Sequence, residues 1–186
     1  MRKSTARLTS MALLIGLAIV LTRVASVRIA IGGIEGIRIG FGSLPIIMAG
    51  AMFGPGAGAM AGALEDLIGY FINPMGPYMP HFTVAQALSG FIPGLILWFR
   101  TTEVPSIMHL MLAVAVGQGI VAVGLRPYFL ETLFGIPRAV TIPPRVVSTV
   151  ADVVIYSTFI QIVMKRLAYG GVLKRLASLR TGSPKS

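Results

Sequence analysis

Glu65 and Asp66 are adjacent carboxylates inside an otherwise apolar, glycine-rich part of the chain. A carboxylate offers only acceptors, so it can bind N–H donors of a ligand or take part in a proton relay. Inserting a carboxylate at membrane depth costs about 2.5–3.5 kcal/mol of free energy on insertion scales. Such a residue is therefore found where it faces a bundle interior, a cavity or a ligand. The pair therefore predicts a small-molecule site within a membrane protein.

The spacing around the two carboxylates separates their roles. Gly58, Gly62, Asp66 and Tyr70 follow one another at steps of four, so they lie on nearly one face of a helix. Glu65 is turned from Asp66 by about 100°. We expect Asp66 and Tyr70 to face a ligand and Glu65 to reach a neighbouring helix or an arginine. A purely structural buried pair is the alternative.

Residues 73–82 offer aromatic side chains beside this helix. The segment is rich in proline and aromatic residues and carries almost no charge, which predicts a rigid loop with stacking faces. Tyr78 and Phe82 are its candidate ligand residues, and an interfacial aromatic belt is the alternative. Gln118, in a later apolar run, is a further buried polar candidate.

Arginines gather in the segments expected on one side of the membrane: Arg28, Arg38, Arg126, Arg138 and Arg145. Residues 126–144 are expected to form an outer loop. Arginine binds carboxylates in a bidentate manner, so this group suits an anionic ligand. Pairing with Glu35 and Glu131 would neutralise at most two of the five.

Composition places these residues in an integral membrane protein. The 186 residues are 55% hydrophobic and 12% charged, with a mean hydropathy of +0.83. Apolar runs of membrane-spanning type lie near residues 8–27, 41–53, 55–72, 83–99, 107–125 and 145–167. We predict one all-α membrane domain over residues 1–186, a bundle of six transmembrane helices. A signal peptide is the alternative for the first run, and Pro45 interrupts the short second one.

The net charge of +10 follows the topology rule rather than a nucleic-acid surface, because the basic residues are scattered at the ends of apolar runs. Ten lie on the side that carries both termini: Arg2, Lys3, Arg7, Arg100, Lys165, Arg166, Lys174, Arg175, Arg180 and Lys185. We therefore expect both termini to be cytoplasmic and residues 168–186 to form a basic cytoplasmic tail.

Two features near the N-terminus suggest contacts with a partner or a ligand. Residues 28–40 alternate apolar with polar or glycine residues, which predicts an external hairpin or lid. Ala12 and Gly16, and likewise Ala18 and Thr22, are small residues four apart along which a second helix can approach closely. Packing within the same bundle and docking of a separate membrane protein are both open.

Common catalytic and metal motifs are absent from the sequence. There is no GxxxxGK[ST], GxSxG or HExxH motif and no cysteine, so we expect neither an enzyme nor a metal or other cofactor. A free-standing proton-coupled carrier remains an alternative, as does, more remotely, an acid-based intramembrane enzyme that uses Glu65, Asp66 and His81. No inverted repeat is visible, which weakens the carrier hypothesis.

Three segments, residues 38–55, 62–70 and 78–90, resemble the substrate-binding S-component of energy-coupling factor (ECF) vitamin transporters, most closely the folate type. The resemblance implies a six-helix bundle in a prokaryotic plasma membrane that holds a vitamin under the loop after the first helix. It also implies a membrane coupling protein, docked at Ala12 and Gly16, and two cytoplasmic ATPase subunits as partners.

Folate fits the residues already named. A pterin presents adjacent N–H donors that Asp66 could accept together. Its rings could stack on Phe41, Tyr78 or Phe82, and its glutamate carboxylates could meet Arg38 or Arg145. The chain departs from the folate pattern at Ser43, Glu65 and His81, so thiamin, pantothenate and hydroxymethylpyrimidine stay open as ligands.

Overall fold

A computed structural model describes residues 2–23, 26–31, 34–74, 77–99 and 104–169. These residues form mainly helices: α1 (Arg2–Arg23), α2 (Ser43–Phe53), α3 (Pro55–Ile72), α4 (Pro80–Trp98), α5 (Ile107–Gln118), η1 (Gly119–Leu125), α6 (Arg126–Phe134) and α7 (Arg138–Tyr169). Because α5, η1 and α6 run on without a break, the helices form six rods, which confirms the predicted six-helix layout.

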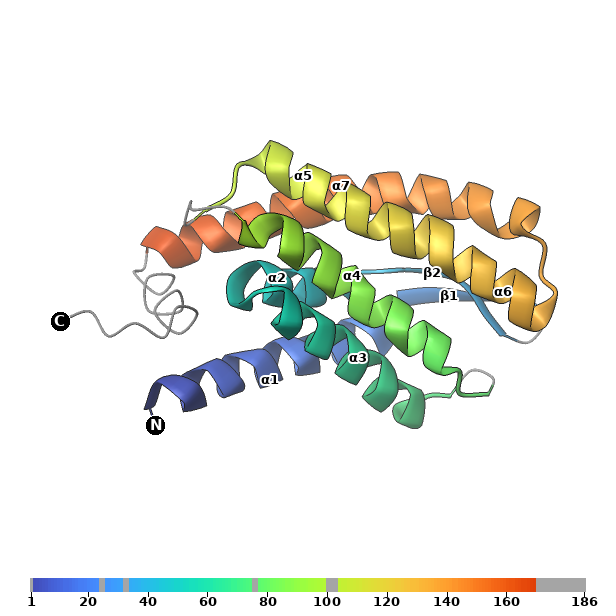
Figure 1. The fold of residues 1–186 in the computed structure, drawn as a ribbon, viewed down its shortest axis with the longest axis horizontal. Coiled ribbons are helices and arrows are strands. Elements are labelled where there is room, and N and C mark those ends of the chain that lie inside the picture. Colours follow the sequence, from blue (N-terminus) through green and yellow to red (C-terminus); the bar gives the residue numbers. More distant parts are fainter. Residues whose placement is uncertain (1, 24–25, 32–33, 75–76, 100–103, 170–186) are drawn as a thin grey trace.

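Four of these rods are long and apolar enough to cross a membrane: residues 5–23, 80–98, 107–134 and 138–169. Helix α2, with 11 residues, is shorter, as expected, but the predicted interruption at Pro45 was wrong, because Pro45 stands in the first turn of a continuous helix. In Figure 1 the rod of α5 to α6 and the long α7 lie side by side, α2 to α4 form the centre, and α1 lies along the opposite side. The start of α1 and the end of α7 are at the same end of the bundle (Figure 1).

The prediction of an outer loop at residues 126–144 was wrong, because most of these residues are helical. Pro127 is the second residue of α6 and directly follows the π-helical turns of η1, so the rod continues through this proline. The turn between α6 and α7 is short because Gly135 adopts φ 66°, and the N–H groups of Gly135 and Ile136 bond the carbonyls of Glu131 and Leu130 at 2.9 and 3.2 Å. Charged residues in α6 and in the first turn of α7 lower the mean hydropathy there. A search for apolar runs therefore did not assign these residues to helices.

Strands β1 (Ser26–Ile31) and β2 (Ile34–Gly40) pair antiparallel, with Ser26 opposite Gly40 and an irregularity after Ile29. The segment predicted as a hairpin is therefore a hairpin. Its function as an external lid stays a prediction.

Glycines allow α2, α3 and α4 to pack at backbone contact. A Cβ at Gly58 would collide with the carbonyl oxygen of Gly90, and one at Gly62 with that of Gln86. Gly54, at φ 99°, makes the sharp turn from α2 into α3. This close packing fixes the position of α3, and with it both carboxylates, relative to α4.

Candidate ligand site

Asp66 lies on α3 at the centre of a small polar and aromatic group. Its Oδ2 accepts a 2.7 Å hydrogen bond from Thr83 Oγ1 on α4, and that hydroxyl lies 3.0 Å from the Tyr78 hydroxyl. The Tyr78 ring in turn meets the Tyr70 ring, with centroids 5.2 Å apart and an interplanar angle of 58°. The structure thus brings together three predicted site residues, Asp66, Tyr70 and Tyr78, and adds Thr83.

Asp66 keeps binding capacity in this arrangement. Within the described residues its Oδ1 makes no hydrogen bond, and the side chain is only half-buried. A carboxylate offers about four acceptor positions, and Thr83 takes one. The group can therefore accept further N–H donors from a bound molecule.

Glu65 has a different environment, as its position on the helix predicted. It is fully buried, and Gln86 Nε2 on α4 donates a 2.8 Å hydrogen bond to its Oε2. The Gln86 Oε1 accepts in turn from Arg126 Nη2 at the start of α6. This chain of contacts, the Glu65–Gln86–Arg126 network, ties α3 to α4 and α4 to α6. Sequence reasoning missed Gln86 and Thr83, although two polar residues three apart in an apolar helix were a usable signal.

Phe82 contacts α6 aromatics. Its ring stacks on Phe134, with centroids 6.4 Å apart and planes at 19°, and meets Phe129 edge-on at 6.2 Å. These contacts join the beginning of α4 to α6. The predicted role of Phe82 in stacking on a ligand stays a prediction, as does that of Phe41, whose side chain is 45% exposed just after β2.

Gln118 and Arg145 are both buried in helices. Gln118 in α5 is 5% exposed, and its Nε2 has no hydrogen-bond partner within the described residues. Arg145 is 6% exposed and lies in the second turn of α7, rather than where an outer loop joins a span. Both are polar groups held inside the bundle, so their predicted contact with a ligand remains a prediction.

Of the other four arginines of the predicted group, two contact protein side chains and two have side chains that the structure does not describe. Arg138 pairs with Glu131, as the sequence allowed, and its guanidinium lies 5.2 Å from the Tyr128 ring centroid. Arg126 is held by Gln86. Arg28 and Arg38 are paired positions of the hairpin, and their side chains lie outside the described part of the structure.

The hairpin is fixed to the bundle where β2 ends. Tyr156 in α7 is 2% exposed, and its hydroxyl donates a 2.5 Å hydrogen bond to the carbonyl oxygen of Gly40. The contact spans 116 positions of sequence. It places the base of the hairpin, which directly precedes Phe41, against α7.

The two small-residue pairs of α1 lie on different faces. Ala18 and Thr22 are fully buried against the bundle, which accounts for one pair by internal packing. Ala12 and Gly16 are exposed, and a Cβ at Gly16 would meet nothing within 4 Å among the described atoms. The outward pair is therefore accessible to another helix.

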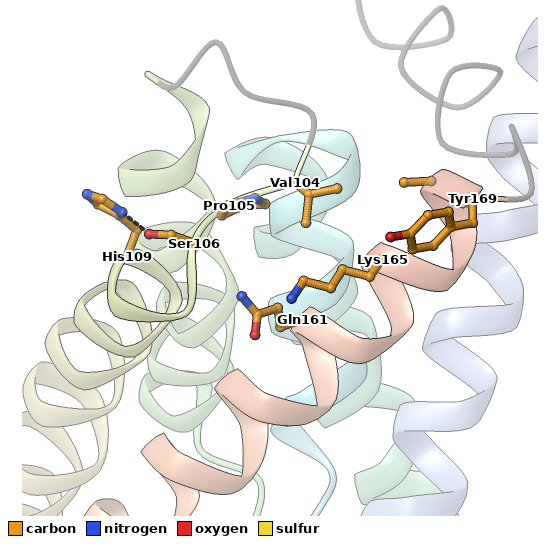
Figure 2. Close-up of a pocket in the computed structure, with 8 residues that line it drawn as sticks. Val104, Pro105, Ser106, His109, Gln161, Lys165 and Tyr169 are labelled. Carbon is orange, nitrogen blue, oxygen red and sulfur yellow. Dashed lines mark hydrogen bonds between the residues drawn. The ribbon is translucent and has the colours of Figure 1, made fainter.

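A cleft of about 790 Å³ lies between the start of α5 and the end of α7 (Figure 2). None of the predicted ligand residues lines it. Among the described residues, no group of three or more His, Asp or Glu could hold a metal ion.

Residues 2–169 match the family model described as "ECF-type riboflavin transporter, S component". The match spans most of the chain, so this protein belongs to the S-component family of ECF transporters. It is therefore a multi-pass membrane protein of a transport system, from a family of transporter components rather than enzymes.

Among curated proteins, the chain is 35% identical over 125 residues to the folate transporter FolT of Clostridium novyi (strain NT), covering 67% of this chain and 68% of that protein. Two solved structures share the fold. A crystal structure of FolT bound with folic acid has a TM-score of 0.71 at 22% identity, over 85% of this chain and 92% of that one. The S component of a bacterial ECF transporter has a TM-score of 0.67 at 23% identity, over 90% and 98%.

Proposed function

We propose that this chain captures folate and delivers it to an ATP-driven coupling module, without catalysing a reaction itself. The observation that carries the proposal is the half-buried Asp66 carboxylate, positioned by Thr83 and flanked by Tyr70 and Tyr78. The identity of 35% to a protein named as a folate transporter supports the same ligand.

Asp66 would recognise the pterin ring of folate. Pterin carries neighbouring N–H donors on one edge, and a carboxylate can accept two of them in parallel. Thr83 holds the carboxylate in one orientation before the ligand arrives, which reduces the entropy lost on binding. The Tyr70 and Tyr78 rings offer aromatic faces beside it.

The glutamate end of folate is anionic and would be bound by arginine. Arg38 in β2 and Arg145 in α7 are the candidates, and Phe41, which lies between β2 and α2 in the chain, would cover the ligand. Gln118 has an unused buried donor that suits a polar atom of the same molecule. In this arrangement the hairpin acts as the external lid.

Delivery would use the outward face of α1. Ala12 and Gly16 leave that face smooth enough for a helix of a membrane coupling protein to pack at close range. The start of α1 and the end of α7 share one end of the bundle, which fits cytoplasmic termini and two ATPase subunits on that side.

Riboflavin is the second candidate ligand, because the matching family model is described by that vitamin. Calorimetric titration of the purified chain with folate, riboflavin, thiamin, pantothenate and biotin separates the candidates. We expect one-to-one binding of folate, at least a hundredfold tighter than of the others, or about 2.7 kcal/mol. Tight binding of riboflavin instead would keep the family role and refute the proposed ligand.

A further inference from the structure

The cleft between α5 and α7 is separate from the residues proposed to bind folate. One wall is the entry to α5, with Val104, Ser106 and His109; the other is the last part of α7, with Gln161, Lys165 and Tyr169 (Figure 2). A smaller cleft of about 280 Å³ adjoins it and shares Lys165 and Tyr169. The larger cleft is a hollow at the end of two candidate membrane-spanning rods.

The polar groups of this hollow are rich in hydrogen-bond donors. Lys165 and Gln161 have no hydrogen-bond or ionic partner within the described residues, and Figure 2 shows the Lys165 amine directed toward Gln161. An ammonium brings three donors and a carboxamide two. Among the described residues that line either cleft there is no carboxylate. An anion with several acceptor oxygens, such as a phosphate, therefore suits the hollow.

The apolar surroundings of the cleft suit a lipid. It lies where α5 begins and α7 ends, at the ends of two candidate membrane spans. The adjoining outer faces are apolar: Met108 and Leu112 on α5 are 70% and 56% exposed, and Ile162 on α7 is 54% exposed. Tyr169, 90% exposed, is an amphipathic residue typical of the membrane interface.

We propose that this cleft binds the headgroup phosphate of an anionic phospholipid, with Lys165 and Gln161 on the phosphate and the acyl chains along the outer faces of α5 and α7. Free phosphate would make only the first set of contacts, whereas a lipid makes both. Basic pockets between membrane helices recognise anionic headgroups by this combination. The inference does not depend on which vitamin the chain captures.

Native mass spectrometry of the detergent-purified full chain tests the proposal, with equimolar phosphatidylglycerol and phosphatidylcholine added. We expect phosphatidylglycerol to be retained about fivefold over phosphatidylcholine, the factor expected for one lysine near an anionic surface. Lys165→Met should bring the ratio close to one, and Gln161→Leu should lower it. Lys165→Arg should preserve it.

The matched control is Arg166→Met, which removes one charge from the neighbouring position that lines only the smaller cleft. It should keep most of the preference. An equal loss in Arg166→Met and Lys165→Met would overturn the proposal, because it would show general attraction by net charge. Displacement of the lipid by millimolar inorganic phosphate would overturn it as well, since the acyl contacts would then add nothing.

Discussion

The Tyr156 hydroxyl on α7 donates a 2.5 Å hydrogen bond to the carbonyl oxygen of Gly40, the last residue of the hairpin. Because Tyr156 is 2% exposed, the donor of this bond is shielded from water. It links the segment proposed as a lid to the long helix that spans the whole bundle. The hairpin is therefore anchored to α7 at its base.

Removing that anchor should loosen the ligand. We expect Tyr156→Phe to speed folate dissociation by about 2- to 10-fold, the equivalent of one hydrogen bond of about 0.5–1.5 kcal/mol. Stopped-flow displacement with excess ligand measures this rate. Tyr169→Phe, at an exposed position, is the control and should leave the rate unchanged. If folate dissociates from Tyr156→Phe at the same rate as from the wild type, the bond does not restrain the hairpin proposed as a lid.

The Glu65–Gln86–Arg126 network should be important for stability rather than for ligand recognition. Gln86→Leu leaves Glu65 buried without its donor, which costs about 1–3 kcal/mol and lowers the thermal midpoint in detergent. In a double-mutant cycle of Glu65→Ala with Gln86→Ala, a coupling energy of about 0.5–3 kcal/mol is expected. Strictly additive effects would contradict a direct interaction.

The backbone contact of α3 with α4 predicts different outcomes at two glycines of the same helix. Gly58→Ala should lower the free energy of unfolding of the protein by about 1–3 kcal/mol, because the added Cβ meets the Gly90 backbone. Gly56→Ala should be neutral or stabilising by up to about 1 kcal/mol, because its Cβ meets no described atom within 4 Å. Thermal midpoints of both variants check this, and similar values would refute the packing described.

The outward face of α1 should be needed for delivery and dispensable for capture. Gly16→Leu should change the affinity for folate by less than twofold, a change in binding free energy below about 0.4 kcal/mol. The same variant should abolish uptake by cells that express the whole transporter. Gly119→Leu is the matched control, since a side chain there also meets no described atom within 4 Å. Normal uptake by Gly16→Leu would place the coupling protein elsewhere.

Local rules were enough to predict the six rods and the alignment of Asp66 with Tyr70, because hydropathy and the helical period act within a single helix. They failed at polar helical turns: at Arg126, where the rod of α5 continues into α6, and at Arg138, where α7 begins. The helical period also predicted that Glu65 turns to a neighbouring helix. It could not supply the partner, because Gln86 meets Glu65 only through the register that close glycine packing sets between α3 and α4.

Calorimetric titration of folate into the purified wild type and Asp66→Asn tests the central claim most directly. Asparagine keeps the size of the side chain and an acceptor for Thr83, so the fold should be retained. The account predicts tight one-to-one binding by the wild type and at least tenfold weaker binding by the variant, about 1.4 kcal/mol. Unchanged affinity in a folded Asp66→Asn would contradict the assignment of Asp66 to the ligand.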